Sequence, residues 1–299
     1  MKIAARLSAN PLLFKELATR MRSRSTPAAI TLFLALTSGI GFMIYLIGTS
    51  SGTRRVGGTG EYGPALFYFL VAMQLIAASF VTPAFAAGAI SAERQRGTLM
   101  LLRASGLSAR SIVVSKFVVA VGYALLFIFV SLPLFSLALL LGGIEPFELL
   151  IALLVILASS VLFVALALFF SAAARSQGLA SALTYAFTVG IVIGIPILML
   201  IAIAGAQNAL GFSMRGGAYQ VVRDLIEGVF GLTTSLSPFS AIISSRAHYE
   251  ATGDAWLFKQ AVFGVGTGVT LPAPYITLTL VYFTGTVILL IQAVRRIDR

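Results

Sequence analysis

The sequence predicts an all-α integral membrane protein, a bundle of six transmembrane helices. Three observations predict it. Apolar residues make up 59% of the 299-residue chain and charged residues only 10%, whereas soluble domains carry about 25% charged residues. Six apolar runs are long enough to cross about 30 Å of hydrocarbon. Basic residues concentrate in alternate connections between those runs, as they do in multi-pass membrane proteins.

The six apolar runs define the expected spans within a single transmembrane domain, 1–299. Three prolines fall inside spans, where each removes a backbone donor and is expected to kink its helix. The third and fourth runs exceed the thickness of the bilayer, so tilt or extension past the membrane is expected. The runs cover residues 27–48, 64–90, 112–142, 147–174, 180–206 and 272–294, and the prolines are Pro83, Pro133 and Pro196.

The distribution of charge predicts the orientation. If both termini are cytoplasmic, the inner side carries 15 basic and 3 acidic residues, a net charge of +12, and the outer side carries 6 basic and 7 acidic residues, a net charge of −1. This asymmetry follows the positive-inside rule. It places the chain in the cell inner (plasma) membrane, with its excess positive charge against anionic lipid rather than nucleic acid.

Composition also excludes several classes of site. The chain has no cysteine and a single histidine, His248, which rules out disulfides, thiolate ligands and a two-histidine metal site. No strongly charged residue lies near the middle of a span, and ion-coupled carriers and intramembrane hydrolases need such groups. We therefore expect no catalytic residue, no metal and no cofactor in this chain.

An amphipathic helix is expected at residues 10–25, ahead of the first span. Asn10 and Pro11 supply a helix cap and a proline at the first helical position. Apolar residues then recur at helical spacing from Phe14, with Lys15 and Glu16 among the polar residues between them. Two interpretations fit this helix: a membrane anchor alone, or an anchor that also contacts a partner.

The connector between the second and third spans, residues 91–110, is the most informative stretch of the chain. It carries one acidic and four basic residues, and the apolar run Leu99–Leu102 lies among them. Gly97 is a flexible point, and Ser108 is a plausible cap for the third span. The composition fits a helix that lies at the membrane surface and contacts a partner outside the membrane. A basic stop-transfer loop is the other interpretation.

The connector resembles the segment between spans two and three of ABC-2 type transporter permeases. The start of the chain resembles the N-terminal elbow helix of that family. Where the family often has Thr-Pro before a Leu-Ser turn, this chain has Ser105-Gly106, and glycine ends a helix by a different route. The residues that carry the resemblance are Ile90-Ser-Ala-Glu-Arg-Gln-Arg-Gly-Thr-Leu99, Leu107-Ser108, Lys116 and Asn10-Pro-Leu-Leu-Phe-Lys-Glu-Leu17.

The resemblance implies the permease subunit of an ATP-driven exporter with an ABC-2, type V exporter-like fold. It implies a second permease copy or paralogue and a separate ABC-type ATPase subunit. No Gly-x-x-x-x-Gly-Lys-Ser/Thr loop occurs in the chain, so ATP and Mg would be bound by that partner. The connector would be the coupling helix. The residues expected to contact the ATPase are Glu93, Arg94, Arg96, Gly97, Thr98, Leu99, Leu102, Lys15 and Glu16.

Four polar residues inside the spans are candidates for a substrate pathway: Gln74, Thr82, Ser159 and Thr188. Most such groups only join helices to one another; Gln74 is the strongest candidate, because a buried amide is the most costly to leave unpaired. The scarcity of polar groups indicates a hydrophobic or amphipathic substrate. The outer segment 207–271, with short helices, could cap the pathway or rest on its own bundle.

Two rival functions remain open from the sequence. One is a membrane scaffold or assembly protein that binds a partner without transport. The other is a transporter that needs no ATPase.

Overall fold

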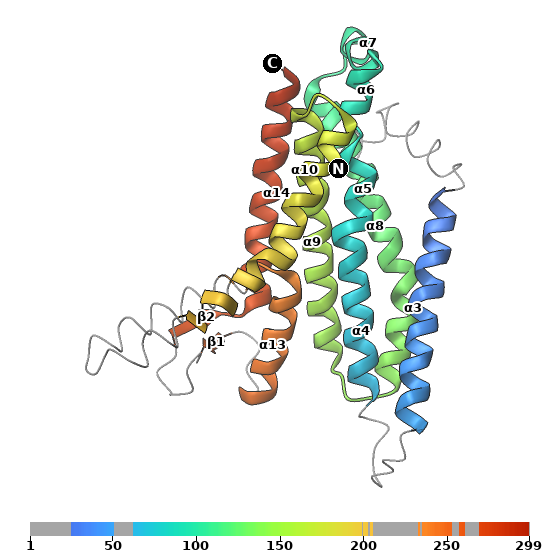
Figure 1. The fold of residues 1–299 in the computed structure, drawn as a ribbon, viewed down its shortest axis with the longest axis vertical. Helices are drawn as coiled ribbons and strands as arrows, with labels where there is room; N and C mark the ends of the chain where they lie inside the picture. Colours follow the sequence, from blue (N-terminus) through green and yellow to red (C-terminus); the bar gives the residue numbers. More distant parts are fainter. Residues whose placement is uncertain are drawn as a thin grey trace, which may run out of the picture. The chain divides into compact units, whose positions relative to one another are not determined.

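The computed structural model describes a helical protein (Figure 1). The chain divides into two compact units, Met1–Thr184 with Gly285–Arg299, and Tyr185–Thr284. Within the described residues, the only strands are β1 (Leu257–Gln260) and β2 (Val269–Pro272), which pair antiparallel. The described residues are 25–50, 62–198, 200–202, 204–205, 233, 235–252, 257–260 and 269–298.

The six predicted spans are confirmed as helices long and apolar enough to cross a membrane. The second span continues five residues further than expected, to Gln95. The expected helix at 10–25 lies outside the described residues except for its last position. Of the segment 207–271, which the sequence predicts to lie outside, the described parts include α13 (Pro238–Thr252) and the strands. The span helices run over Thr26–Ile47, Gly63–Gln95, Ala109–Leu140, Pro146–Ala173, Gln177–Ala202 and Pro274–Asp298.

The first unit is built around α9 (Pro146–Ala173), the most deeply buried of the six spans. It packs against α4 (Tyr62–Ile76), α5 (Thr82–Ala87) and α8 (Ala109–Leu140). Buried alanines recur along α9 and let neighbouring helices approach closely. By contrast, α3 (Ser25–Ser50) leaves most of its apolar side chains exposed, as a lipid-facing helix does.

Two of the three span prolines follow a π-helical turn. Ala77–Val81 precedes Pro83, and Gly190–Gly194 precedes Pro196. In each case the residue after the π turn donates its N–H five residues back, from Thr82 to Ala77 and from Ile195 to Gly190. Such a turn reroutes the hydrogen bonds where a proline lacks an N–H. The third proline, Pro133, stays inside the continuous helix α8.

The carbonyl that Pro196 leaves without its usual helical donor has another partner. A proline cannot donate to the residue four positions earlier, here Val192. The hydroxyl of Ser237, at the start of α13, donates to that carbonyl at 3.2 Å and is fully buried. In the same unit, the Tyr282 hydroxyl donates to the Leu236 carbonyl at 2.6 Å. These two bonds fasten the start of α13 within its own unit.

Replacing Ser237 with alanine is expected to lower the free energy of unfolding by about 1 kcal/mol, because the Val192 carbonyl loses its donor away from water. Thermal unfolding of the detergent-solubilised protein measures the effect. Ser245→Ala is the matched control on the same helix, since that hydroxyl bonds only to the Ala241 carbonyl of its own helix. Equal shifts in Tm for the two variants would contradict the assignment.

Candidate functional site in the connector between spans two and three

The connector contains two short helices rather than one. Helix α6 covers Ser91–Gln95 and α7 covers Thr98–Ala104. Gly97 separates them with φ of 71°, a left-handed conformation that costs a residue with a Cβ about 1–2 kcal/mol. Gly106, with φ of 82°, ends α7 in the way glycine ends many helices.

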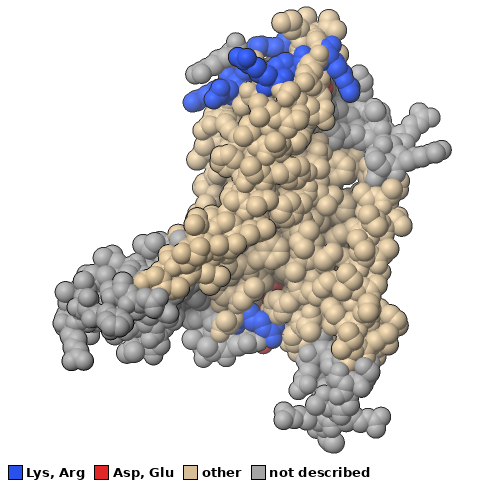
Figure 2. Space-filling view, viewed as in Figure 1, with Lys and Arg blue, Asp and Glu red and all other residues tan. Residues whose placement is uncertain are grey.

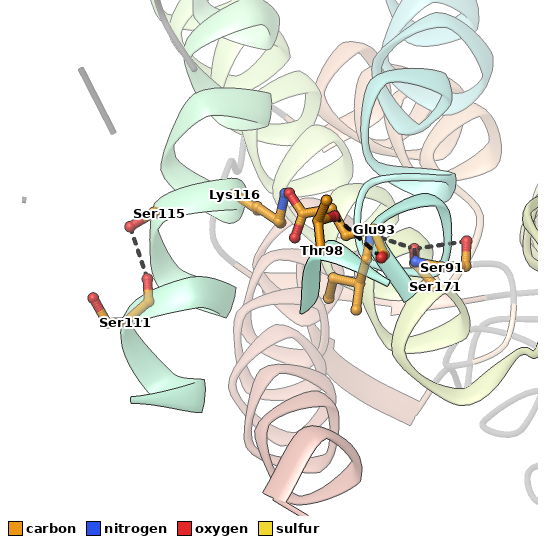
Figure 3. Close-up of polar contacts among 8 residues, drawn as sticks. Ser91, Glu93, Thr98, Ser111, Ser115, Lys116 and Ser171 are labelled. Carbon is orange, nitrogen blue, oxygen red and sulfur yellow. Dashed lines mark hydrogen bonds and ion pairs between the residues drawn. The ribbon is translucent and has the colours of Figure 1, made fainter. Parts of the chain in front are cut away.

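The connector begins at a buried junction with α9. The backbone N–H groups of Ile90 and Ser91 both donate to the hydroxyl oxygen of Ser171, at 2.9 and 3.1 Å. All three residues are completely buried, and Figure 3 shows the Ser91 and Ser171 side chains together. Ser171 therefore satisfies two backbone donors at the place where the second span turns and no helical acceptor is available.

Arg94 fastens α6 to the end of α9. Its guanidinium donates to the carbonyls of Ala172 and Ala174, at 2.8 and 3.1 Å. These are among the last carbonyls of α9, which have no partner within the helix. A cation at this position also interacts favourably with the helix dipole.

Glu93 faces the other way and fastens α6 to α8. Its Oε1 lies 2.7 Å from Nζ of Lys116, and Figure 3 shows the two side chains pointing toward each other. The lysine side chain is only 3% exposed and the glutamate side chain 23%. Ser108 caps α8 as the sequence predicts, since its hydroxyl accepts the Ser111 N–H at 3.2 Å. Adjacent residues of α6 therefore fasten it to two different spans.

A third polar contact fastens α7 to the last span, α14 (Pro274–Asp298). Arg103 donates to the Ile297 carbonyl at 2.7 Å and lies 3.3 Å from the Asp298 carboxylate. The charged pair is about half exposed, so its Coulomb contribution is small. The carbonyl bond caps the C-terminal end of α14.

The two faces of α7 differ sharply. Leu99 belongs to a buried cluster with residues of α5, α8, α9 and α14, and Leu102 packs against that cluster. Met100 and Leu101 are 82% and 70% exposed, and Arg96, just before α7, is also exposed. The spacing of Leu99 and Leu102 predicts that they share one helix face; that signal could have singled out Met100 and Leu101 as the outward pair.

Comparison with known families decides the identity. The model of the ABC-2 family transporter proteins matches residues 53–291, which includes the whole connector. The chain belongs to the ABC-2 family. It is a permease component of an ABC transporter, a membrane protein with several spans. A search of the curated proteins finds no match.

The permease uses several of the expected contact residues internally. Glu93 and Arg94 bond to α8 and α9, Thr98 donates to the Glu93 carbonyl at 3.2 Å, and Leu99 and Leu102 face the core. Arg96 and Gly97 are exposed. Lys15 and Glu16 lie outside the described residues. Arg103 and Ser171, which the sequence did not identify as site residues, form two of the connector's main contacts.

The four candidate pathway residues of the permease are all buried. The hydroxyls of Thr82 and Ser159 donate to carbonyls of their own helices, at 3.1 and 2.7 Å, which fits a structural role. Gln74 Oε1 and Thr188 Oγ1 have no hydrogen-bond partner among the described residues. Gln74 therefore remains the strongest candidate, because its amide oxygen is buried without a partner among the described residues.

The described part of the permease contains an apolar pocket of about 530 Å³ between α3, α4 and α8. Leucines form most of its wall, among them Leu66, Leu70 and Leu137. Thr37 and Ser38 also line it, but their hydroxyls bond to carbonyls of their own helix. The pocket therefore presents hydrocarbon to any occupant, and none of the four pathway candidates lines it.

Removing one partner of the Glu93–Lys116 pair is expected to destabilise the permease by about 1–3 kcal/mol, because a buried ammonium then loses its hydrogen-bonded counter-ion. Glu93→Ala tests this by denaturant unfolding in micelles. Combining it with Lys116→Met is expected to recover most of the loss. Asp298→Asn is the control in an exposed pair and should cost under about 1 kcal/mol. Additive losses in the double variant would contradict the pairing.

Proposed function

We propose that the permease is the transmembrane subunit of an ATP-driven exporter whose connector docks onto a separate ABC-type ATPase. The observation that carries this proposal is the exposed pair Met100 and Leu101. A helix outside the spans, fastened to its own bundle on one side, presents two large apolar side chains on the other. Apolar side chains among arginines are typical of the centre of a protein–protein interface.

The fastening of the connector explains how docking would act on the spans. α6 is bonded to α8 and α9, and α7 to α14. A displacement of α7 by the partner would therefore reach three spans through hydrogen bonds rather than through a loose loop. ATP binding in the partner, with Mg²⁺, would shift the populations of inward-open and outward-open states. A second permease copy or paralogue would complete the translocation path.

The composition of the membrane part supports a hydrophobic or amphipathic substrate. The pocket between α3, α4 and α8 is lined almost wholly by hydrocarbon. Its volume of about 530 Å³ is in the range of small-molecule sites. Gln74 is the polar group that we assign to the pathway, because its amide oxygen is buried without a partner among the described residues.

Replacing Met100 and Leu101 with aspartate is expected to abolish association with the ATPase, because two carboxylates would enter an apolar contact. The tagged permease is purified from its native host, and a co-purifying chain with a P-loop sequence is identified by mass spectrometry. Met100→Leu with Leu101→Met is the control and keeps association, since the swap conserves apolar volume. A wild-type permease that never co-purifies with an ATPase would refute the proposal and favour a scaffold or an ATP-independent transporter.

The proposed orientation, with both termini cytoplasmic, is tested by cysteine labelling, since the chain has no cysteine of its own. Ser105→Cys, in the exposed turn after α7, is expected to react with an impermeant maleimide only after the cells are opened. Glu145→Cys, in the exposed turn before α9, is expected to react in intact cells. The reverse labelling pattern would show that both termini lie outside the cell.

A further inference from the structure

The contact between Arg103 and the end of α14 brings two exposed features together. The bond to the Ile297 carbonyl holds the last turn of the final span against α7. Ile297 and Ala293 of α14 also belong to the buried cluster that contains Leu99. The outward side of that last turn carries Arg295 and Arg296, both exposed. Neither arginine has a hydrogen bond or ion pair within the part of the chain that the structure describes.

The result is a surface that two distant parts of the chain build together. Met100 and Leu101 of α7 supply its apolar part, and Arg295 and Arg296, which directly precede the Ile297 that Arg103 of α7 binds, supply its positive charge. Figure 2 shows Lys and Arg side chains gathered at this end of the molecule, where Figure 1 places α6, α7 and the C-terminal end of α14. We call these four residues the composite surface.

The apolar part of the composite surface is turned away from the spans. The inner side of α7 packs on α5, α8, α9 and α14 through Leu99, and Met100 and Leu101 lie on the exposed side of the same helix. Figure 1 shows α7 past the end of α5. Membrane lipid surrounds the sides of a bundle, whereas a soluble partner reaches its end. For α7, this placement favours a protein partner over a lipid headgroup.

We propose that the ATPase subunit binds this composite surface, so that the last turn of the final span is part of the docking site together with α7. The proposal rests on the proposed function and specifies the partner's chemistry. The docking face of the ATPase has an apolar socket for Met100 and Leu101 and, next to it, carboxylates that pair with Arg295 and Arg296. Opposite charges across an interface speed association and fix its register. Arginine is well suited to this, because its guanidinium binds a carboxylate through two parallel hydrogen bonds.

The first experiment measures affinity. The permease is reconstituted in nanodiscs of neutral phosphatidylcholine and titrated with the purified ATPase that co-purifies with it. Arg295→Glu with Arg296→Glu is expected to weaken binding by about tenfold or more at 0.1 M salt and to flatten its salt dependence. Arg110→Glu with Arg175→Glu is the matched control, since both are exposed arginines outside α7 and α14. It is expected to change the affinity by less than about twofold.

The outcomes separate this proposal from the proposed function. If the wild-type permease does not bind the ATPase, the proposed function fails. If aspartates at 100 and 101 abolish binding but the Arg295 and Arg296 variant binds like the wild type, the composite surface is refuted and the proposed function stands. Equal losses of affinity in the variant and its control would show that binding depends only on the net charge at this end of the permease, and would refute the composite surface. A loss seen only in discs that contain phosphatidylglycerol would assign the arginines to lipid.

The second experiment locates the contact. A photo-reactive amino acid is placed at position 100, 296 or 140 in turn, and irradiated complexes are analysed by mass spectrometry. Positions 100 and 296 are expected to cross-link to the ATPase. Leu140, which is 83% exposed at the opposite end of α8, is the control and is expected not to. Cross-linking from 100 but not from 296 would overturn the proposal.

Discussion

A backbone that turns inside a helical bundle has to satisfy its polar groups without water, and Ser171 meets that constraint for this permease. Its one hydroxyl accepts the N–H groups of two consecutive residues at the turn that precedes α6. The connector can therefore begin while it is still buried among apolar residues.

Beyond Ser91, each polar side chain that fastens the connector contacts a different span. Glu93 and Arg94 are neighbours with opposite charge, and they reach α8 and α9 respectively. Nine residues beyond Arg94, Arg103 reaches α14. Each contact also provides a partner for a group that is costly to leave alone, either a buried ammonium or a terminal helix carbonyl. The same bonds that fold this region thus connect it mechanically to the spans.

The sequence predicted what depends on local composition and length. The six spans are visible as apolar runs, and the cap at Ser108 is visible because a serine precedes a helical pattern. Contacts between residues about 80 or 195 positions apart produce no local pattern in the sequence. In the sequence, Ser171 is one small residue in a span, and Arg103 is one basic residue among several. Likewise, the sequence predicted simple kinks at Pro83 and Pro196, where the structure has π turns, and the bond from Ser237 to the Val192 carbonyl joins residues 45 positions apart. The inward positions of Leu99 and Leu102 became clear once the bounds of α7 were known.

The left-handed glycine between α6 and α7 makes the connector a bent lever. One arm is attached to α8 and α9 and the other to α14, and only Arg96 and Gly97 join them. Glycine adopts this positive φ without the clash that a Cβ would cause, so the bend can be this tight. The Thr98 hydroxyl bonds to the Glu93 carbonyl across the bend, so force on the outer arm is passed to the inner arm at a fixed angle.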